Sequence, residues 1–325
     1  MGLYSLIGAV TNALEIEMAR DENIVIFGED VGKEGGVFRA TEGLQEKFGE
    51  KRCFDTILAE ANIIGSAVGM AMNGLKPVPE IQFSGFMHPA YNHIASHVAR
   101  MRNRTRGRYT TPITIRMPYG GGINALESHS ESLEVQFASL PGLKLVIPSN
   151  PYDAKGLLIS AIRDDDPVIF MEPKRIYRAG KQEIPDGEYT VELGKARVIK
   201  EGSDLTVVSW GAMVKDTQIA VKELEAKGYS IEIIDLRTIQ PWDKETVMNS
   251  VKKTGRVAVV NEAVRSFGPA AEIMASVNED AFLYLEAPAT RITGMDIIIP
   301  LAQGEHHHMP DPKYIAYKLE EVLKF

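Results

Sequence analysis

Short β-rich runs alternate with helical patterns along most of this chain. In the first part of the sequence, strand-like runs bounded by glycine or proline fall at 23–30, 54–59, 76–83, 112–118, 143–149 and 167–172. Helical patterns lie between them at 60–73, 87–104 and 151–163, and an amphipathic helix is predicted near the N-terminus. Such alternation is typical of a parallel sheet covered by helices on both faces. We therefore predict an α/β fold.

The alternation weakens over residues 178–204, which are polar and rich in turn signals. It then resumes with strand-like runs at 204–211, 229–236 and 256–263, and it ends with an amphipathic helix at 311–325. A chain of 325 residues exceeds the size at which one hydrophobic core usually stops growing. We predict a first α/β domain over 1–185, a linker over 186–203 and a smaller α/β domain over 204–325.

Charge and cysteine content restrict the function classes. A net charge of −8 disfavours non-specific attraction to nucleic acid or to an anionic membrane surface. Alternating arginines from Arg100 to Arg108 hint at nucleic acid in isolation, but a solvated helix end or ion pairs between subunits fit this acidic chain better. Cys53 is the single cysteine, so the chain contains no internal disulfide and no cysteine-based metal or iron–sulfur site. A reducing cytosol fits, and we expect a cytoplasmic protein.

The N-terminal segment lacks the basic start of a signal peptide, and acidic residues appear from Glu15 onward. No segment has the roughly 20 uninterrupted apolar residues that a membrane-spanning helix requires. We expect neither a cleaved leader nor a membrane span.

Glu60 begins a run of small apolar residues that is predicted to be helical. An acid in the first turn of a helix is favoured by the helix dipole, so capping is one explanation. Proton exchange with a bound cofactor is the other, and composition does not choose between them. Ala61, Gly65, Gly69 and Asn73 recur every four residues, which predicts close packing of another helix, either in the same domain or across a subunit boundary.

Several long blocks of sequence resemble one family. They are DTILAEANIIGSAVGMAMNGLKPVPEIQF, ITIRMPYGGG, HSESLE, PGLKLVIPSNPYDAKGLLISAIRDDDPVIFMEPKRIYR and IIDLRTIQPWD. In order and over essentially the whole chain, they resemble the β subunit of the thiamine-diphosphate-dependent 2-oxo acid dehydrogenases. The resemblance implies a parallel-sheet domain that binds the pyrimidine of thiamine diphosphate, followed by a smaller α/β domain like the transketolase C-terminal domain.

The resemblance also implies site residues. Glu60 would hydrogen-bond the aminopyrimidine ring of thiamine diphosphate as the principal catalytic carboxylate, and Leu58, Gln82 and Phe86 would lie near the cofactor. Phe86 stands where some branched-chain members have a tyrosine, so it implies an apolar wall rather than a hydroxyl. A lone histidine is more often structural than catalytic, but the family match makes His129 a second catalytic residue that assists acylation of a lipoyl group.

Half of the implied cofactor site is absent from this chain. It has no Gly-Asp-Gly with a paired asparagine, the pattern by which thiamine enzymes hold the diphosphate through Mg²⁺. The glycines at 120–122 are a weak phosphate signal and fit a flexible turn better. The resemblance therefore implies an α subunit that supplies the diphosphate and Mg²⁺ site in an α2β2 heterotetramer. It further implies a structural monovalent cation, usually K⁺, at Ile113, Thr114, Ala161, Ile162, Asp164 and Asp166.

The predicted function is decarboxylation of a small 2-oxo acid, with a branched-chain substrate favoured, followed by acylation of the lipoyl group of an acyltransferase. Pyruvate or acetoin dehydrogenase is the alternative, and a non-catalytic scaffold subunit is the non-enzyme alternative. A self-sufficient transketolase would need the missing diphosphate motif, and a ferredoxin-linked oxidoreductase would need more cysteines. The second domain is predicted to contact other subunits and the acyltransferase core, and 306–308 to form a loop.

Overall fold

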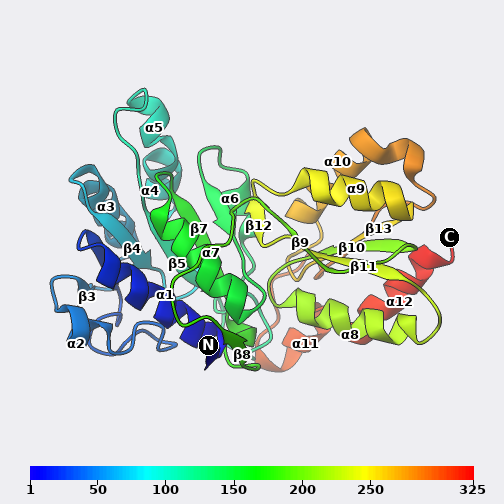
Figure 1. Cartoon of the computed structure of the whole chain (residues 1–325), viewed down its shortest axis with the longest axis horizontal. Coiled ribbons are helices and arrows are strands. Elements are labelled where there is room, and N and C mark those ends of the chain that lie inside the picture. Colours follow the sequence, from blue (N-terminus) through cyan, green and yellow to red (C-terminus); the bar gives the residue numbers. More distant parts are fainter.

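The computed structural model describes residues 1–325 as two α/β domains that lie side by side (Figure 1). The first domain contains a seven-stranded sheet in the order β12-β6-β7-β5-β4-β2-β3. Its strands are β2 (Ile24–Gly28), β3 (Cys53–Asp55), β4 (Lys76–Glu80), β5 (Thr114–Tyr119), β6 (Lys144–Val146), β7 (Val168–Pro173) and β12 (Thr238–Gln240). All of them except β12 run parallel, which confirms the predicted parallel sheet.

Helices cover both faces of this sheet. They are α1 (Leu6–Arg20), α2 (Leu44–Phe48), α3 (Glu60–Met72), α4 (Tyr91–Ser96), α5 (Met101–Arg104), α6 (Glu134–Ala138) and α7 (Pro151–Arg163). Helices α1 and α7 pack together on one face, whereas α3 and α4 share the other. The start of α7 follows from its sequence, because Asn150 accepts a hydrogen bond from the Asp153 N–H and Pro151 occupies the first turn.

The segment 87–104 is not the continuous helix that we predicted. It consists of α4 and α5 together with the short 3₁₀ turns η2 (His88–Ala90) and η3 (Val98–Arg100). The backbone of His97 leaves helical geometry, with φ −120° and ψ −62°, and this breaks the segment between α4 and η3.

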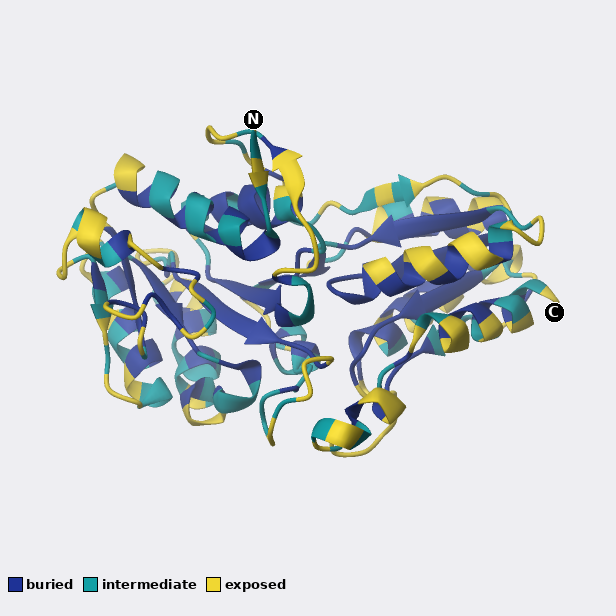
Figure 2. Cartoon of the chain, turned by 90° about the horizontal axis from the view of Figure 1, so that it is seen from below, coloured by how far each residue is buried: buried dark blue, intermediate teal, exposed yellow.

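The second domain contains a five-stranded sheet in the order β14-β13-β10-β11-β9. Its elements are β9 (Arg197–Lys200), β10 (Leu205–Ser209), α8 (Met213–Glu225), β11 (Ile231–Asp235), α9 (Lys244–Thr254), β13 (Val257–Val260), α10 (Pro269–Ala281), η5 (Phe282–Tyr284), β14 (Thr290–Ile292), η6 (Ala302–Gly304), α11 (Glu305–His308) and α12 (Pro312–Leu323). A small separate pair, β1 (Gly2–Tyr4) with β8 (Gln182–Ile184), joins the N-terminus to the end of the first domain. Figure 2 shows both large sheets as buried layers beneath helices with exposed outer faces.

Two strands differ from the predicted domain division. Strand β9 lies inside the segment 186–203 that we predicted to be a linker, and it pairs antiparallel with β11 at the edge of the second sheet. Its alternating exposed and half-buried residues gave only a weak strand signal. Strand β12 comes from the second half of the chain, yet it pairs antiparallel with β6 of the first sheet. The chain therefore crosses between the domains three times, before β9, before β12 and before α9.

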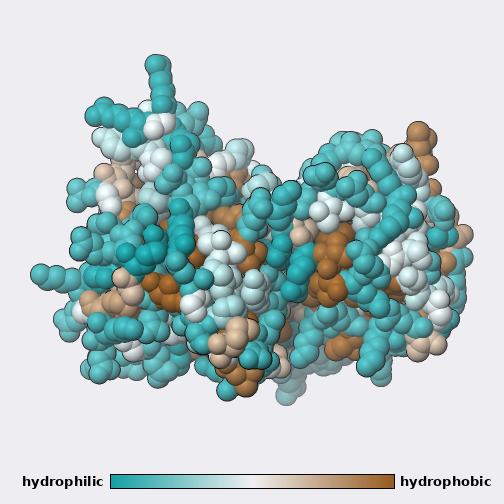
Figure 3. Space-filling model, in the orientation of Figure 1, coloured by the Kyte–Doolittle hydropathy of each residue, from teal (hydrophilic) through white to brown (hydrophobic).

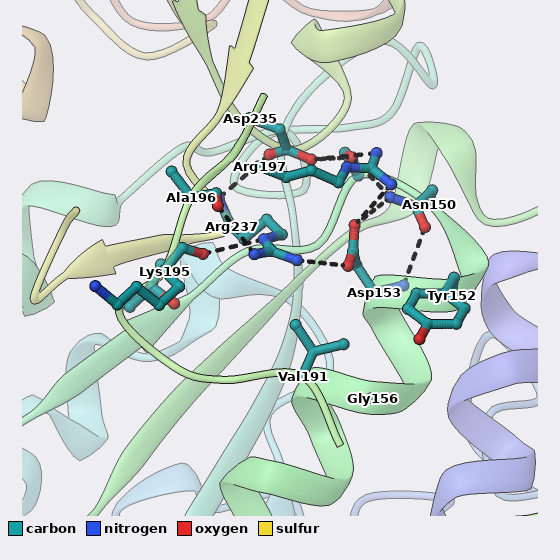
Figure 4. Close-up of polar contacts among 12 residues, drawn as sticks. Asn150, Tyr152, Asp153, Gly156, Val191, Lys195, Ala196, Arg197, Asp235 and Arg237 are labelled. Atoms are coloured by element: carbon teal, nitrogen blue, oxygen red, sulfur yellow. Dashed lines mark hydrogen bonds and ion pairs between the residues drawn. The ribbon is translucent and has the colours of Figure 1, made fainter. Parts of the chain in front are cut away.

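An ion-pair network holds this crossing in place (Figure 4). Arg237, just before β12, has a left-handed backbone with φ 58° and donates from Nη1 to Asp153 Oδ1 of α7 at 3.1 Å. Asp235, at the end of β11, accepts a hydrogen bond from the Ser149 hydroxyl of the first domain. Burial raises the pKa of Asp235 to about 7. Because one hydrophobic cluster of 35 buried residues also spans both domains, they form a single packed unit.

No helix in the structure is both long and apolar enough to span a lipid bilayer.

Candidate active site

Glu60 is the first residue of α3, and it does not cap that helix. The N-cap is Ala59, which makes no side-chain capping bond. Glu60 is half-buried, and its carboxylate makes no hydrogen bond or ion pair within the chain. The two residues Ile57 and Leu58, just before it, are 73% and 70% exposed. A partly buried carboxylate without a partner, beside exposed apolar side chains, favours a role toward a group outside this chain.

Two further carboxylates and an amide lie at the same edge of the first sheet. Glu29 and Asp30 follow β2, and Gln82 follows β4, so these side chains meet at the carboxyl ends of neighbouring parallel strands. Gln82 Nε2 lies 3.3 Å from Asp30 Oδ2. Burial raises the pKa of Glu29, and the charges of Asp30 and Glu60 add to this shift. Ligands of open parallel sheets bind at this edge. Sequence reasoning missed Glu29, although its position directly after a buried strand was a usable signal.

His129 lies on the same side of the sheet, against the turn that follows β4. Its ring centroid is 4.4 Å from that of Phe83 and 5.0 Å from that of Phe86. Nδ1 lies 2.8 Å from the Glu127 carbonyl oxygen. A carbonyl can only accept, so Nδ1 carries the proton and Nε2 of the neutral ring keeps a free lone pair. Phe86 is thus an apolar wall of the histidine, and its place beside the cofactor stays a prediction.

The loop that carries His129 contains no helix or strand between β5 and α6. Its ends are nevertheless tied together, because the Gly120 N–H donates to the Glu131 carbonyl at 2.9 Å and the Ser84 hydroxyl donates to the same oxygen at 2.8 Å. Gly85 is also required, since a Cβ there would lie 2.1 Å from the Ser128 oxygen. The predicted flexible turn is therefore an irregular but well-tethered loop.

The second domain supplies two buried carboxylates to the glycine turn of this loop. Glu262 Oε2 accepts from the Gly121 N–H at 2.7 Å. Glu305 accepts from the Gly122 N–H at 2.9 Å and from the Asn124 N–H at 2.6 Å. The predicted contacts of this domain with other subunits and with the acyltransferase core do not include this one, so the prediction was incomplete. Sequence reasoning missed both glutamates because they lie about 140 and 180 residues from the loop, and no local pattern links them to it.

Positive charges balance these carboxylates. Lys174 is buried, donates to the Gly120 carbonyl, and has its pKa lowered by burial to about 8 although Glu262 and Glu305 oppose this shift. Arg175 donates to Asp216 Oδ2 at 2.7 Å and counters the burial that raises the pKa of Glu262. The glycine turn is therefore embedded in a charge cluster that belongs to both domains.

The residues predicted for a monovalent cation gather near the amino ends of β5 and β7 and the end of α7. Their groups already have partners within the chain. The Asp164 carboxylate lies 2.5 Å from Lys144 Nζ, and that of Asp166 lies 2.5 Å from Arg102 Nε. The Ile113 carbonyl accepts from the Val168 N–H at 3.0 Å. A carbonyl has a second lone pair, so the cation site stays a prediction that this geometry permits.

The histidines at 306–308 form the short helix α11 rather than the predicted loop. His308 is buried, whereas the rings of His306 and His307 are exposed with centroids 3.9 Å apart. No cluster of three or more histidine, cysteine or acidic side chains in the structure is arranged to hold a metal ion.

Comparison with known proteins agrees with this architecture. The family described as the transketolase pyrimidine-binding domain matches residues 4–180, and the transketolase C-terminal domain matches 194–315. A solved structure of an inactive β4 tetramer of a split-gene transketolase superposes with a TM-score of 0.81 over 99% of both chains, at 21% identity, and so supports the fold.

Curated relatives match over almost the whole chain. A pyruvate dehydrogenase E1 component subunit beta from Acholeplasma laidlawii is 60% identical, covering 100% of this chain and 99% of the relative. The subunit of the same name from Mycoplasma genitalium is 54% identical, and the match covers 98% of this chain and 98% of the relative. The one from Bacillus subtilis is 51% identical, and the match covers 100% of each. This chain belongs to the β-subunit family of the thiamine-diphosphate-dependent 2-oxo acid dehydrogenases, with transketolase-type pyrimidine-binding and C-terminal domains.

Proposed function

We propose that this chain is the β subunit of a pyruvate dehydrogenase E1 component. With an α subunit it would decarboxylate pyruvate and transfer the acetyl group to a lipoyl arm. The observation that carries the proposal is the half-buried carboxylate of Glu60, which has no partner in the chain and lies at the ligand-binding edge of the first sheet. The names of the relatives favour pyruvate over the branched-chain substrate that we expected.

The residues at this edge fit thiamine diphosphate. Glu60 is free to exchange a proton with a ring nitrogen, Leu58 and Phe86 offer apolar surface, and Gln82 offers an amide. When bound, the cofactor supplies the electron sink for loss of carbon dioxide. Glu60 would hold the proton at the pyrimidine ring, and the neighbouring Glu29 has its pKa raised by burial first and then by the charges of Asp30 and Glu60.

His129 would act in the second half of the reaction. Because Nδ1 is fixed on the Glu127 carbonyl, Nε2 is the atom available to a lipoyl sulfur. The aromatic rings of Phe83 and Phe86 fix the imidazole plane, so the proton is exchanged at one defined position. Glu60 and His129 are thus assigned to different steps.

An α subunit would complete the site. The chain has no diphosphate-binding pattern, so the partner would hold the diphosphate and Mg²⁺. Exposed apolar side chains at Ile57, Leu58 and Leu126 surround the proposed site and would be covered by that partner. On α3, a Cβ at Gly69 would meet nothing within 4 Å, so this part of the small-residue stripe is open to a helix from another subunit. We propose an α2β2 assembly on these grounds.

The far end of the second domain would dock the lipoyl acyltransferase. Phe282, Leu283 and Tyr284 of η5 are exposed. Phe282 also lines a groove at this end of the domain, and the C-terminal Phe325 lines the same groove. Figure 3 shows hydrophobic atoms projecting over the end of α10, away from the cleft between the domains.

We also propose that K⁺ binds near Asp164, where it would brace the amino ends of β5 and β7.

Co-expression with an α subunit tests the proposal. The purified complex, supplied with thiamine diphosphate and Mg²⁺, should decarboxylate pyruvate faster than branched-chain 2-oxo acids, and this chain alone should be inactive. Preference for a branched-chain acid would overturn the substrate assignment. An assembled complex that turns over no 2-oxo acid would instead favour a scaffold subunit.

A further inference from the structure

The loop between β5 and α6 depends on the second domain for its shape. Three successive glycines make room for side chains from outside the loop, because a Cβ at Gly120 would lie 2.8 Å from Glu262 Oε1 and one at Gly121 would lie 2.8 Å from Glu305 Oε1. A Cβ at Gly122 would collide with the Arg175 side chain at 2.1 Å. The glycine turn is therefore a cradle for charged groups of this same chain.

Glu305 binds the loop further along the chain toward His129 than Glu262 does, at Gly122 and Asn124 rather than at Gly121. It is 1% exposed, and each of its two carboxylate oxygens accepts a backbone N–H of the loop. The next contact along the loop again comes from the second domain, since the Ala302 N–H lies 3.4 Å from the Ala125 carbonyl. His129 follows four residues later and is fixed to Leu126 and Glu127 carbonyls.

Different parts of the loop are held by different domains. The first domain ties the two ends together, because Gly120 and Ser84 both donate to the Glu131 carbonyl. The second domain binds the stretch from Gly121 to Ala125, where it replaces the hydrogen bonds that a helix or strand would have provided. Losing a buried carboxylate that accepts two N–H groups leaves both donors unsatisfied, and the loop would have to rearrange to reach water.

We propose that Glu305 is a positioning residue for His129, through which the second domain sets where Nε2 of His129 meets the lipoyl group. This inference rests on the proposed function, because it takes the role of His129 from there. Glu305 is not a catalytic residue in this scheme, since its carboxylate is closed in by the loop and touches no reacting atom.

The experiment uses the assembled α and β complex with two readouts. One is decarboxylation measured with an artificial electron acceptor, and the other is acetylation of an isolated lipoyl domain. For Glu305→Ala we expect kcat/KM for the lipoyl domain to fall about ten- to hundredfold, while reduction of the artificial acceptor falls less than about threefold. Glu305→Gln keeps one accepting oxygen, so its kcat/KM for the lipoyl domain should lie between those of Glu305→Ala and the unchanged protein.

Two further variants control for folding and for charge. Gly121→Ala disturbs the same contact from the loop side, because its Cβ would lie 2.8 Å from Glu305 Oε1. Its backbone is not left-handed, so an alanine adds no backbone strain there. It should reproduce the selective loss of acetylation with the glutamate in place. Glu279→Ala removes an exposed carboxylate of α10 that makes no ion pair, and it should change neither readout.

A double variant decides whether Glu305 acts through His129. In a His129→Ala background, Glu305→Ala should lower acetylation by less than about twofold, because the group that it positions is already gone. Additive losses, or equal losses in both readouts, would overturn the inference while leaving the role of His129 intact. If His129→Ala itself spares acetylation, the proposed role of His129 fails, and the inference fails with it.

Discussion

Two groups of carboxylates in this molecule are arranged in opposite ways. At the edge of the first sheet, Glu60 is half-buried and has no partner in the chain. At the boundary between the domains, Glu262, Glu305 and Asp153 are buried, and backbone N–H groups or arginines bind each of them. Because a buried charge is costly unless it is paired, the second arrangement is what one folded chain requires of itself.

The difference separates two functions of the same side-chain type. A carboxylate with all its acceptors used can hold geometry, but it has no capacity left for a ligand. A carboxylate that keeps its acceptors free, in a partly dry position, can exchange protons with something that binds later. The comparison thus predicts that substitutions at the first group change turnover directly. Substitutions at the second group change stability, and at Glu305 they change activity only through the geometry of the His129 loop.

The largest effect is expected for Glu60→Gln in the assembled complex. The amide keeps the size of the side chain but cannot donate a carboxyl proton, so decarboxylation should fall by about 10²- to 10⁴-fold. The free energy of unfolding should change by less than about 0.5 kcal/mol, since no hydrogen bond within the chain is lost. Steady-state rates and chemical denaturation measure the two quantities.

Glu22→Gln is the matched control, because Glu22 is exposed and makes no ion pair. A Glu60→Gln complex that retains full turnover would remove Glu60 from the proposed mechanism. A large loss of stability would instead place Glu60 with the structural carboxylates and break the comparison.

The opposite pattern is expected for Glu262→Ala. This change removes the acceptor of the Gly121 N–H and leaves Lys174 and Arg175 with less negative charge around them. Breaking a buried charge cluster in this way should lower the free energy of unfolding by about 3 to 5 kcal/mol. The midpoint of urea denaturation gives the measurement, with Glu245→Ala on the exposed face of α9 as the control.

If Glu262→Ala unfolds at the same urea concentration as that control, the domain boundary is held by its apolar cluster rather than by charge.

The position of the first group of carboxylates could partly be predicted from the sequence, and that of the second group could not. The alternation of strands and helices predicted the parallel sheet, and the place of Glu60 at the start of a helix was correct, because both depend on local pattern. The family match supplied the proposed role of Glu60, which composition left open. Whether Glu60 caps α3 needed the structure, since capping depends on where the carboxylate points.

The second group depends on contacts across the domain boundary. Glu305 meets Gly122 across 183 residues, and β12 leaves its own domain to pair with β6. Neither contact has a signature within a window of sequence, because both are set by how two finished sheets pack. The prediction of one continuous helix over 87–104 was wrong for a related reason, since tertiary packing overrode a helical pattern.

A smaller effect is expected for the way in which pH changes the stability of the domain boundary. The folded pKa of Asp235 is about 7, above its ordinary value of 3.8, so the folded state holds a proton that the unfolded state releases. This contribution to stability is complete below the unfolded pKa and is lost as pH rises through about 7. Relative to Asp235→Asn, the protein should lose up to about 1.4 kcal/mol per pH unit within this window.

Denaturation at a series of pH values between 5 and about 8 measures this difference for the two proteins. Parallel curves for the two proteins would show that Asp235 is already ionised near neutrality, through Arg197 and Arg237, and that the boundary does not respond to pH.

The smallest effect is expected at the predicted cation site, whose carboxylate shares features with both groups. Asp164 already has Lys144 as a partner, yet its neighbouring backbone carbonyls keep lone pairs for a monovalent cation. A site filled to about ten times its Kd adds about 1.4 kcal/mol, so the melting temperature in KCl should exceed that in LiCl of equal ionic strength by about 2 to 4 °C. Asp164→Asn should shrink this difference, whereas Glu22→Gln should preserve it. Equal melting temperatures in the two salts would mean that the Lys144 ammonium suffices, and Asp164 would then belong with the carboxylates that serve the fold alone.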